Sequence, residues 1–399
     1  MLGLKMSHGI LQQLSMAAQD KTPVKGYTHN FYRYPARFSP TFASTAIRLF
    51  SKPGDIVLDP YMGGGTTAVE AMLAGRHVIG TDLNSLAVFI AKVKTTRLDS
   101  SEKDALCRWA EQTIPQLKYN LPIASVCEEP YDNRTKNMNV PRARFIKKIL
   151  DAALDSTNNL PTIQARNFAR CAILKTTQWS IDGRKTHVPL SQYRHKLQEH
   201  IFQMLEQLDA LVNTVTANHT HFPQCILFET DAAQINNKPP FLTHDTKADL
   251  VVTSPPYPGL HVLYHRWQVN GRRETPAPYW ISGCQDGQGD SYYNFGSRHQ
   301  PGHNTYFETS LQTLRAIRNV LRPGAYMVQL LAFSAPQTQL PRYLANMESA
   351  GFKEVNFKEW DNVSCNTRIW RDVPSRKWHA MLQGKTFGSK EVVLVHVAN

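Results

Sequence analysis

Short apolar runs alternate with helical patterns on both sides of a long middle segment of this 399-residue chain. Such runs, bounded by turn residues, are typical of buried strands, and the helices between them suit crossover connections. The pattern predicts an α/β domain. Strands are predicted at 55–59, 77–81, 224–228, 249–253, 326–331, 354–360 and 392–397, and helices at 10–18, 41–49, 306–320 and 341–349.

The middle segment, residues 100–221, is mostly helical and is not required by the α/β repeat. Its strongest helix, at 193–215, carries an apolar stripe at helical spacing. We interpret the segment as an insertion that either binds the target or caps the fold, and its basic cluster favours target binding. Helices are predicted at 102–117, 142–154, 163–177 and 193–215, and the basic cluster comprises Arg142, Arg144, Lys147 and Lys148.

A glycine-rich turn follows the first strand of the α/β pattern, from Pro60 to Thr67, and leads into a helix. Glycines let a backbone approach a ligand closely, and a helix N-terminus offers free N–H donors. Neither the G-x-G-x-x-G of a dinucleotide fold nor the G-x-x-x-x-G-K-[ST] of a phosphate loop is present. The turn therefore favours a nucleoside cofactor without a diphosphate, such as S-adenosylmethionine.

Three aspartates at predicted strand ends fit that cofactor. Asp59, beside the glycine turn, suits its positive charges. Asp82 is placed to accept hydrogen bonds from a ribose diol, and Asp231 from an adenine amine. A helix cap or a turn is the structural alternative for Asp82 and Asp231.

The strand at 249–253 runs directly into Ser254-Pro255-Pro256-Tyr257. Two adjacent prolines fix φ and remove two backbone donors, so nearby carbonyls are left as acceptors. Acceptors beside a serine hydroxyl and an aromatic face suit a planar ring that bears an exocyclic amine. Tyr257 would stack on that ring.

Residues 258–304 form a long segment rich in glycine and aromatic residues. Long loops in compact domains are usually functional or disordered, and the aromatic content argues against disorder. We predict a loop that faces nucleic acid, with a folded cap over the pocket as the alternative. The arm at 27–40 is predicted to pack rather than to contact nucleic acid. The candidate DNA contacts are Arg266, Arg272, Arg273 and Arg298.

The net charge of +13 favours a polyanionic partner, foremost nucleic acid. No apolar run is long enough to span a membrane, and no export signal is evident, so a cytoplasmic, nucleoid-associated protein is expected. The six cysteines show no paired spacing, which argues against structural zinc and disulfides. No metal site is expected.

With these motifs identified, the chain resembles the amino-group DNA methyltransferases, S-adenosylmethionine enzymes that methylate an exocyclic nitrogen of cytosine or adenine. The segment from Asp59 to Thr67 is similar to the family's D-P-F-x-G-S-G-T-T loop, with mild departures at Tyr61 and Gly64. Residues 253–257 match T-S-P-P-Y without departure. The arm at 33–38 is similar to a less specific cofactor motif. Together these cover about half of the chain.

The resemblance implies a Rossmann-like class I methyltransferase sheet, mostly parallel with an antiparallel last strand, and a helical insertion. It implies cofactor-binding and catalytic halves at 1–99 and 222–399. The segments 100–221 and 258–304 both remain candidates for target recognition. The cofactor contacts implied are Phe38, Asp59, Pro60, Gly63, Gly65, Thr66, Asp82 and Asp231, and the catalytic residues Ser254, Pro255, Pro256 and Tyr257.

Serine before the two prolines is similar to the cytosine-N4 enzymes, which implies methyl transfer to a cytosine flipped out of double-stranded DNA. Restriction-modification, with a partner endonuclease acting on the same site, is the implied setting. Adenine-N6 methylation is the alternative within the enzyme class. A silent nucleic-acid-binding protein on the same fold is the alternative outside it.

Overall fold

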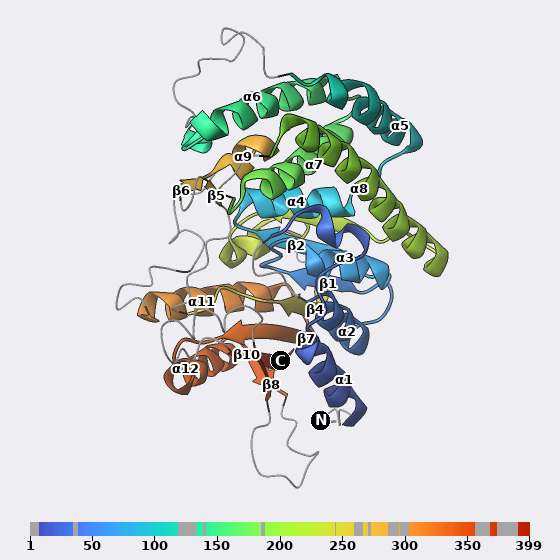
Figure 1. Cartoon of the computed structure of the whole chain (residues 1–399). Helices are drawn as coiled ribbons and strands as arrows, with labels where there is room; N and C mark the ends of the chain where they lie inside the picture. Colours follow the sequence, from blue (N-terminus) through green and yellow to red (C-terminus); the bar gives the residue numbers. More distant parts are fainter. Residues whose placement is uncertain are drawn as a thin grey trace.

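The computed structural model of the 399-residue chain shows a central sheet with helices on both faces and a helical layer beyond one end (Figure 1). The structure describes residues 8–34, 39–118, 133–138, 141–184, 188–243, 245–258, 266–269, 273–285, 295, 303–355, 368–372 and 390–399.

The main sheet has the strand order β3-β2-β1-β4-β7-β10-β8, with β9 paired to β10. β1 to β4 and β7 run parallel, whereas β10 is antiparallel to its neighbours. This confirms the predicted Rossmann-like α/β fold with an antiparallel last strand. The strands are β1 (Ile56–Asp59), β2 (His77–Asp82), β3 (Cys225–Glu229), β4 (Ala248–Thr253), β7 (Leu321–Ala332), β8 (Phe352–Glu354), β9 (Ile369–Asp372) and β10 (Lys390–Ala398), and β5 (Trp267–Val269) and β6 (Arg273–Thr275) form a separate hairpin.

The helices lie close to their predicted positions. The long helices are α1 (His8–Gln19), α2 (Pro40–Phe50), α3 (Thr66–Leu73), α4 (Ser85–Thr95), α5 (Ser100–Arg108), α6 (Pro141–Ser156), α7 (Ile163–Ile181), α8 (Leu190–Asn218), α9 (Ala277–Ser282), α11 (His303–Asn319) and α12 (Pro336–Ser349). The short helical turns are η1 (Tyr27–Phe31), η2 (Trp109–Thr113), η3 (Ile114–Gln116), η5 (Asn133–Thr135), η6 (Thr157–Asn159) and η7 (Ala232–Asn237).

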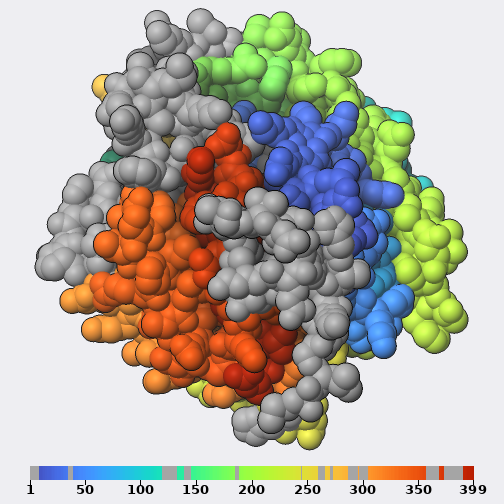
Figure 2. Space-filling view, turned by 90° about the horizontal axis from the view of Figure 1, so that it is seen from below, coloured from blue at the N-terminus to red at the C-terminus, as the bar shows by residue number. Residues whose placement is uncertain are grey.

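Alternate residues of the central strands bury on opposite faces of the sheet. Val57 and Val252 pack with α1, α2 and α3, whereas Leu58 and Val251 pack with α11, α12 and η7. A strand buried on both faces reads as a continuous apolar run, which is the pattern seen in the sequence. Figure 2 shows the N-terminal elements lying against the C-terminal part of the chain, in agreement with the contact between α1 and β9.

The helices α5 to α8 share one apolar core with the β5–β6 hairpin and α9; we call these elements the helical layer. Trp267 and Tyr279, both from the segment 258–304, are fully buried in it. Residues 266–269 and 273–285 of that segment are therefore folded against the helices of residues 100–221. Trp267 and Tyr279 thus pack inside the protein and do not present their rings to a ligand, whereas the prediction that the segment faces nucleic acid stays a prediction.

Two boundaries differ from expectation. β7 begins at Leu321, ahead of the predicted strand start at 326, and its pairing with β4 shifts register between Ala248 and Leu250. The strand predicted at 354–360 is observed as β8, which ends at Glu354, and residues 356–367 lie outside the described part. Among the described residues, no helix is long and apolar enough to cross a membrane.

Candidate active site

The carboxyl ends of β1 to β4 meet at one edge of the sheet because these strands run parallel. In open α/β sheets, ligands bind outside this edge. β1 ends at Asp59, β2 at Asp82 and β4 at Thr253, directly before Ser254. We call this group the strand-tip site. The glycine turn and the proline motif leave the sheet side by side there.

The glycine turn is closed against α4. Gly63 and Gly65 have φ angles of 47° and 76°, the left-handed region that favours glycine. A Cβ atom on Gly65 would also lie 2.8 Å from the Cβ of Ala91. The ammonium group of the buried Lys94, in the last turn of α4, donates a hydrogen bond to the Gly64 carbonyl at 2.6 Å. The backbone of the turn is therefore fixed by contacts within the protein.

Asp82 ties the glycine turn to β2. Its Oδ2 accepts the Gly63 N–H and its Oδ1 accepts the Asn84 N–H, each at 2.8 Å. Burial raises the pKa of Asp82 to about 6, against the lowering by these two hydrogen bonds. A carboxylate oxygen can accept more than one hydrogen bond, so acceptor capacity toward a hydroxyl ligand remains.

Asp59 joins the glycine turn to the proline motif. Its Oδ1 accepts the Thr253 hydroxyl at 2.6 Å and the Tyr61 N–H at 3.2 Å. Asp59 is only 4% exposed, and this burial raises the pKa of its carboxyl group to about 6. The two motifs, 194 positions apart, thus share a hydrogen bond at the base of the site.

These two carboxyl groups test whether a cationic cofactor fits. Neither forms an ion pair with a cation of the described residues, although Asp59 is buried and Asp82 is half-buried at the end of β2. A buried carboxylate is costly without a compensating charge. The sulfonium and ammonium groups of S-adenosylmethionine would supply that charge, so the residues present fit this cofactor. In the described part of the chain, no cluster of three or more His, Cys, Asp or Glu could hold a metal.

Aromatic residues of the N-terminal arm cover the glycine turn. Tyr34 lies 3.5 Å from the place of a Cβ on Gly63, and its hydroxyl accepts a long hydrogen bond, 3.4 Å, from Asn84 Nδ2. The Tyr279 hydroxyl of α9 donates to Asn84 Oδ1 at 3.0 Å. The described part of the arm is packed, as predicted, and it connects the strand-tip site to the helical layer.

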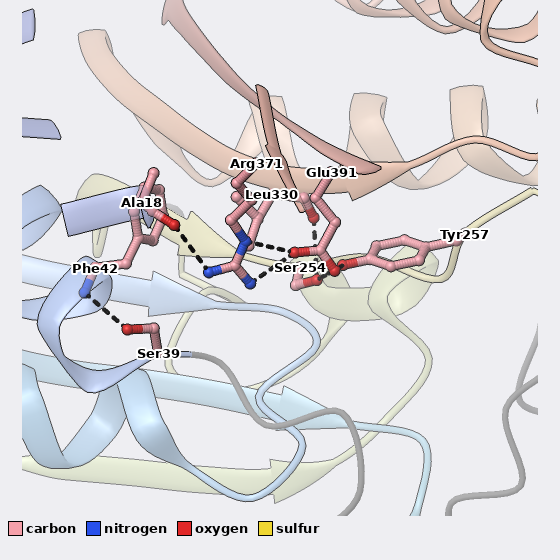
Figure 3. Close-up of polar contacts among 8 residues, drawn as sticks. All are labelled: Ala18, Ser39, Phe42, Ser254, Tyr257, Leu330, Arg371 and Glu391. Carbon is pink, nitrogen blue, oxygen red and sulfur yellow. Dashed lines mark hydrogen bonds and ion pairs between the residues drawn. The ribbon is translucent and has the colours of Figure 1, made fainter. Parts of the chain in front are cut away.

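The proline motif is held by hydrogen bonds to β7 and β10 (Figure 3). Ser254 Oγ donates to the Leu330 carbonyl at 3.0 Å and lies 2.8 Å from the Tyr257 hydroxyl. That hydroxyl in turn lies 2.9 Å from Glu391 Oε1. The Tyr257 ring is thereby anchored at its hydroxyl end, a constraint that the sequence did not indicate.

The backbone carbonyls of the proline motif differ in whether they already accept a hydrogen bond within the protein. The Pro256 carbonyl accepts the Tyr306 hydroxyl at 2.8 Å. Among the described residues, neither the Ser254 nor the Pro255 carbonyl receives a hydrogen bond. The expected acceptors beside the serine hydroxyl are therefore present.

The other predicted cofactor residues have mixed positions. The Pro60 carbonyl accepts the Thr81 hydroxyl, and Thr66 is buried at the start of α3. Asp231 is exposed and caps η7 by accepting the Ala233 N–H at 2.9 Å, which is the structural alternative named for it. Phe38 lies outside the described residues. A cofactor role for these residues stays a prediction.

The predicted DNA-contacting arginines are only partly described. Arg273 is exposed on β6, and Arg266 forms a long ion pair, 3.8 Å, with Glu274. Arg272 and Arg298 lie outside the described residues. Of these arginines, Arg273 offers the clearest exposed cation beside the helical layer.

The residues at the site that the sequence did not indicate include Asn84, Lys94, Tyr279 and Glu391. Lys94 reads as an ordinary polar position at the end of a helix, and Tyr279 as part of a loop that faces nucleic acid. Glu391 directly precedes the predicted strand 392–397, and an acidic residue at the start of an apolar run was the available signal.

Residues 16–93 match the DNA methylase family model of N6 and N4 amino-methyltransferases. The chain is similar to the type II methyltransferase M.MvaI of Kocuria varians, 36% identical over 103 residues, covering 25% of this chain and 21% of that protein. It is also similar to M.MjaII of Methanocaldococcus jannaschii, 31% identical over 98 residues, covering 25% of this chain and 18% of that protein. The chain thus spans about a fifth of the length of these relatives.

Among solved structures, TrmN from Thermus thermophilus is similar over 91% of this chain and 49% of its own, at 12% identity and a TM-score of 0.33. The fold is assigned from the strand order of the central sheet.

Proposed function

We propose, from the premise that this chain belongs to the amino-group DNA methylase family, that it transfers a methyl group from S-adenosylmethionine to N4 of cytosine in double-stranded DNA. The observation that carries the proposal is the hydrogen bond between Thr253 and Asp59. It joins a glycine turn of the cofactor-binding type to a Ser-Pro-Pro-Tyr motif, so a methyl donor and a planar amine would meet in one site. The family match itself ends at residue 93, so the reaction, the substrate and the base are proposals.

The residues of the site would act mainly by positioning. When bound, S-adenosylmethionine supplies a methyl group on a positively charged sulfur. Asp59 balances that charge at the base of the site, and Asp82 accepts from hydroxyl groups. Ser254 Oγ and the Pro255 carbonyl accept the two N–H hydrogens of the target amine, which turns its lone pair out of the ring plane. Such orientation and electrostatic stabilisation account for large rate accelerations.

Proton transfer follows methyl transfer in this scheme. A serine hydroxyl is too weakly basic to remove a proton from a neutral aromatic amine. Ser254 Oγ and the Pro255 carbonyl would hold the amine nitrogen toward the methyl group that the bound cofactor would supply, with the sulfur as the leaving group. The methylated nitrogen then carries a positive charge and loses one proton to solvent.

Cofactor affinity should fall as the pH is lowered from 7 to 5. The raised pKa values of Asp59 and Asp82, both about 6, mean that each carboxyl gains a proton in this range and loses the charge that a cationic cofactor needs. The dissociation constant should rise roughly 10- to 100-fold, with about tenfold for each group that must be ionised. Isothermal titration calorimetry at several pH values measures it; a constant affinity over this range would separate both carboxyls from cofactor binding.

The helical layer is the proposed surface for DNA recognition. It contains residues of both 100–221 and 258–304, the two candidate segments for target recognition. It contacts the strand-tip site through the hydrogen bond between Tyr279 and Asn84. A cavity of about 300 Å³ within the helical layer is lined by two cations and two carboxylates, Arg134, Arg170, Asp151 and Asp155, together with Trp280. The net charge of +13 supports a polyanionic partner for the chain as a whole.

Replacing Arg273 by alanine should weaken DNA binding and lower its salt dependence. Each cation that neutralises a phosphate contributes about one unit to the slope of log K against log salt. The slope should therefore fall by about one in fluorescence anisotropy titrations. Arg48→Ala is the matched control, because Arg48 is exposed in the last turn of α2, which leads to the opposite edge of the sheet. Equal slopes for both variants would move the DNA interface away from β6.

Incubation with methyl-labelled S-adenosylmethionine tests the proposed function. Duplex DNA of mixed sequence, single-stranded DNA and RNA are offered in parallel, and the modified nucleosides are separated. Label in N4-methylcytosine from duplex DNA is expected. Label in N6-methyladenine would replace cytosine by adenine as the target, and cofactor binding without transfer to any nucleic acid would favour a silent binding protein.

A further inference from the structure

A buried ion pair between Arg371 and Glu391 lies between the proline motif and Ala18 of α1 (Figure 3). Glu391 Oε2 accepts from Arg371 Nε at 2.7 Å and forms an ion pair with the second guanidinium nitrogen at 2.6 Å. The two side chains are only 11% and 6% exposed. Arg371 also donates to the Ala18 carbonyl at 3.3 Å, so the pair is supported from the last turn of α1.

The other carboxylate oxygen of Glu391, Oε1, is linked to Ser254 through the Tyr257 hydroxyl. Tyr257 places its hydroxyl 2.9 Å from Glu391 Oε1 and 2.8 Å from Ser254 Oγ. Ser254 Oγ lies 3.0 Å from the Leu330 carbonyl. These three short contacts involve two hydroxyl groups, and each hydroxyl carries a single proton. At most two of the three contacts can hold a proton at the same time.

The acceptors decide which contacts hold the protons. The carboxylate of an ion pair is a stronger acceptor than a neutral hydroxyl, so Tyr257 donates to Glu391. The Leu330 carbonyl can only accept, so Ser254 donates to it. The remaining contact between Ser254 and Tyr257 then has no proton, and the lone pairs of Ser254 Oγ are available to another donor.

We propose that Arg371 and Glu391 form a positioning pair that draws the Tyr257 proton away from Ser254 and so keeps Ser254 Oγ an open acceptor for the N–H of the target amine. This inference rests on the proposed function for the identity of that donor. Neither residue touches the substrate in this scheme. Glu391 acts through Tyr257, and Arg371 acts through Glu391.

Glu391→Gln is the decisive variant because it reverses one hydrogen bond with almost no change of shape. A glutamine amide can donate to the Tyr257 oxygen, which leaves the tyrosine proton to point at Ser254. The serine then accepts from Tyr257 instead of from the substrate. The single-turnover rate at saturating cofactor and DNA should fall roughly 10- to 100-fold, as expected for losing one hydrogen bond of a charged group.

Glu354→Gln is the matched control. Glu354 accepts from both Arg368 Nε and Nη2, at 2.7 and 2.9 Å, and joins β8 to the residue before β9. It therefore loses an ion pair on the same side of β10, at the other end of that strand and without a link to Tyr257. Its rate should stay within about twofold of the parent. Similar losses in both variants would show that Glu391 has only a structural role and would overturn the proposal.

Tyr257→Phe provides a readout that a structural role would not produce. Without the tyrosine hydroxyl there is no proton to direct, so Glu391→Gln should cause no further loss of rate in the Tyr257→Phe background. Losses that multiply in the double variant would contradict the proposal.

A spectroscopic measurement separates failure of the proposal from failure of the proposed function. In protein labelled with 3-fluorotyrosine, the Tyr257 signal is assigned by its absence from Tyr257→Phe. Glu391→Gln should shift that ¹⁹F signal, whereas Glu354→Gln should leave it in place. A shift in a chain that transfers no methyl group would support the hydrogen bond and reject the methyltransferase. An unshifted signal would reject the positioning pair, whatever the activity.

Discussion

Ser254→Ala should reduce methyl transfer about 100- to 1,000-fold while cofactor affinity stays unchanged, which is the range seen when one positioned hydrogen-bonding group is removed from an active site. Ser254 Oγ is the side-chain acceptor proposed for the target amine. It makes no hydrogen bond to Asp59, Asp82 or the glycine turn, so cofactor binding does not depend on it. Single-turnover methylation and calorimetric titration measure the two effects.

Ser51→Ala is the control for that substitution. Ser51 also donates to a backbone carbonyl, that of Ile47 at 2.6 Å, and it accepts from Arg76, but it lies after α2 at the opposite edge of the sheet. Its loss should leave the methylation rate near that of the parent. A Ser254→Ala variant with a rate close to the parent would remove the serine from the mechanism.

Asp59→Asn should change cofactor binding and stability in opposite directions. The cofactor dissociation constant should rise about 100-fold, because one partner of a buried charge pair is lost. The pKa of Asp59 is raised from 3.8 to about 6 on folding, so the stability that its protonated form contributes is present below pH 3.8 and is lost as the pH rises through 6. At pH 7.5 the buried carboxylate is therefore destabilising, and the asparagine variant should be more stable by on the order of 2 kcal/mol.

Asp249→Asn provides the opposite pattern. Asp249 accepts the Ile56 N–H at 2.8 Å and pairs with Arg322 at 2.9 Å, at the amino end of β4. This variant should be somewhat less stable than the parent and bind cofactor with equal affinity. Urea unfolding and calorimetry measure both quantities. If Asp59→Asn also lost stability and kept its affinity, Asp59 would be a structural residue and not the partner of a cationic cofactor.

The predictable parts of the site are those whose conformation is set by residues adjacent in the sequence. The strand ending at Asp59, the glycines that adopt positive φ and the two prolines after Ser254 each have a local physical reason to be where they are. Because parallel strands end at the same edge, the sequence was enough to place these segments together.

The remaining contacts join residues far apart in the chain, and local patterns do not indicate them. Thr253 was expected to end a strand and to begin the T-S-P-P-Y motif, but its hydrogen bond to Asp59 was not predicted. Glu391 contacts Tyr257 only because β10 returns antiparallel to β7, which sets its register against the motif. Local patterns also did not indicate that Trp267 and Tyr279, two of the aromatic residues that suggested ligand contact, are buried against the helices.

The most direct measurement is the mass of the nucleosides released from duplex DNA after a single turnover with S-adenosylmethionine that carries a trideuterated methyl group. The account predicts that the trideuterated methyl appears on N4 of cytosine in the parent chain and is lost in Ser254→Ala. Duplex DNA that contains every short sequence context and yet gains no trideuterated methyl, while the chain binds the cofactor, would contradict it.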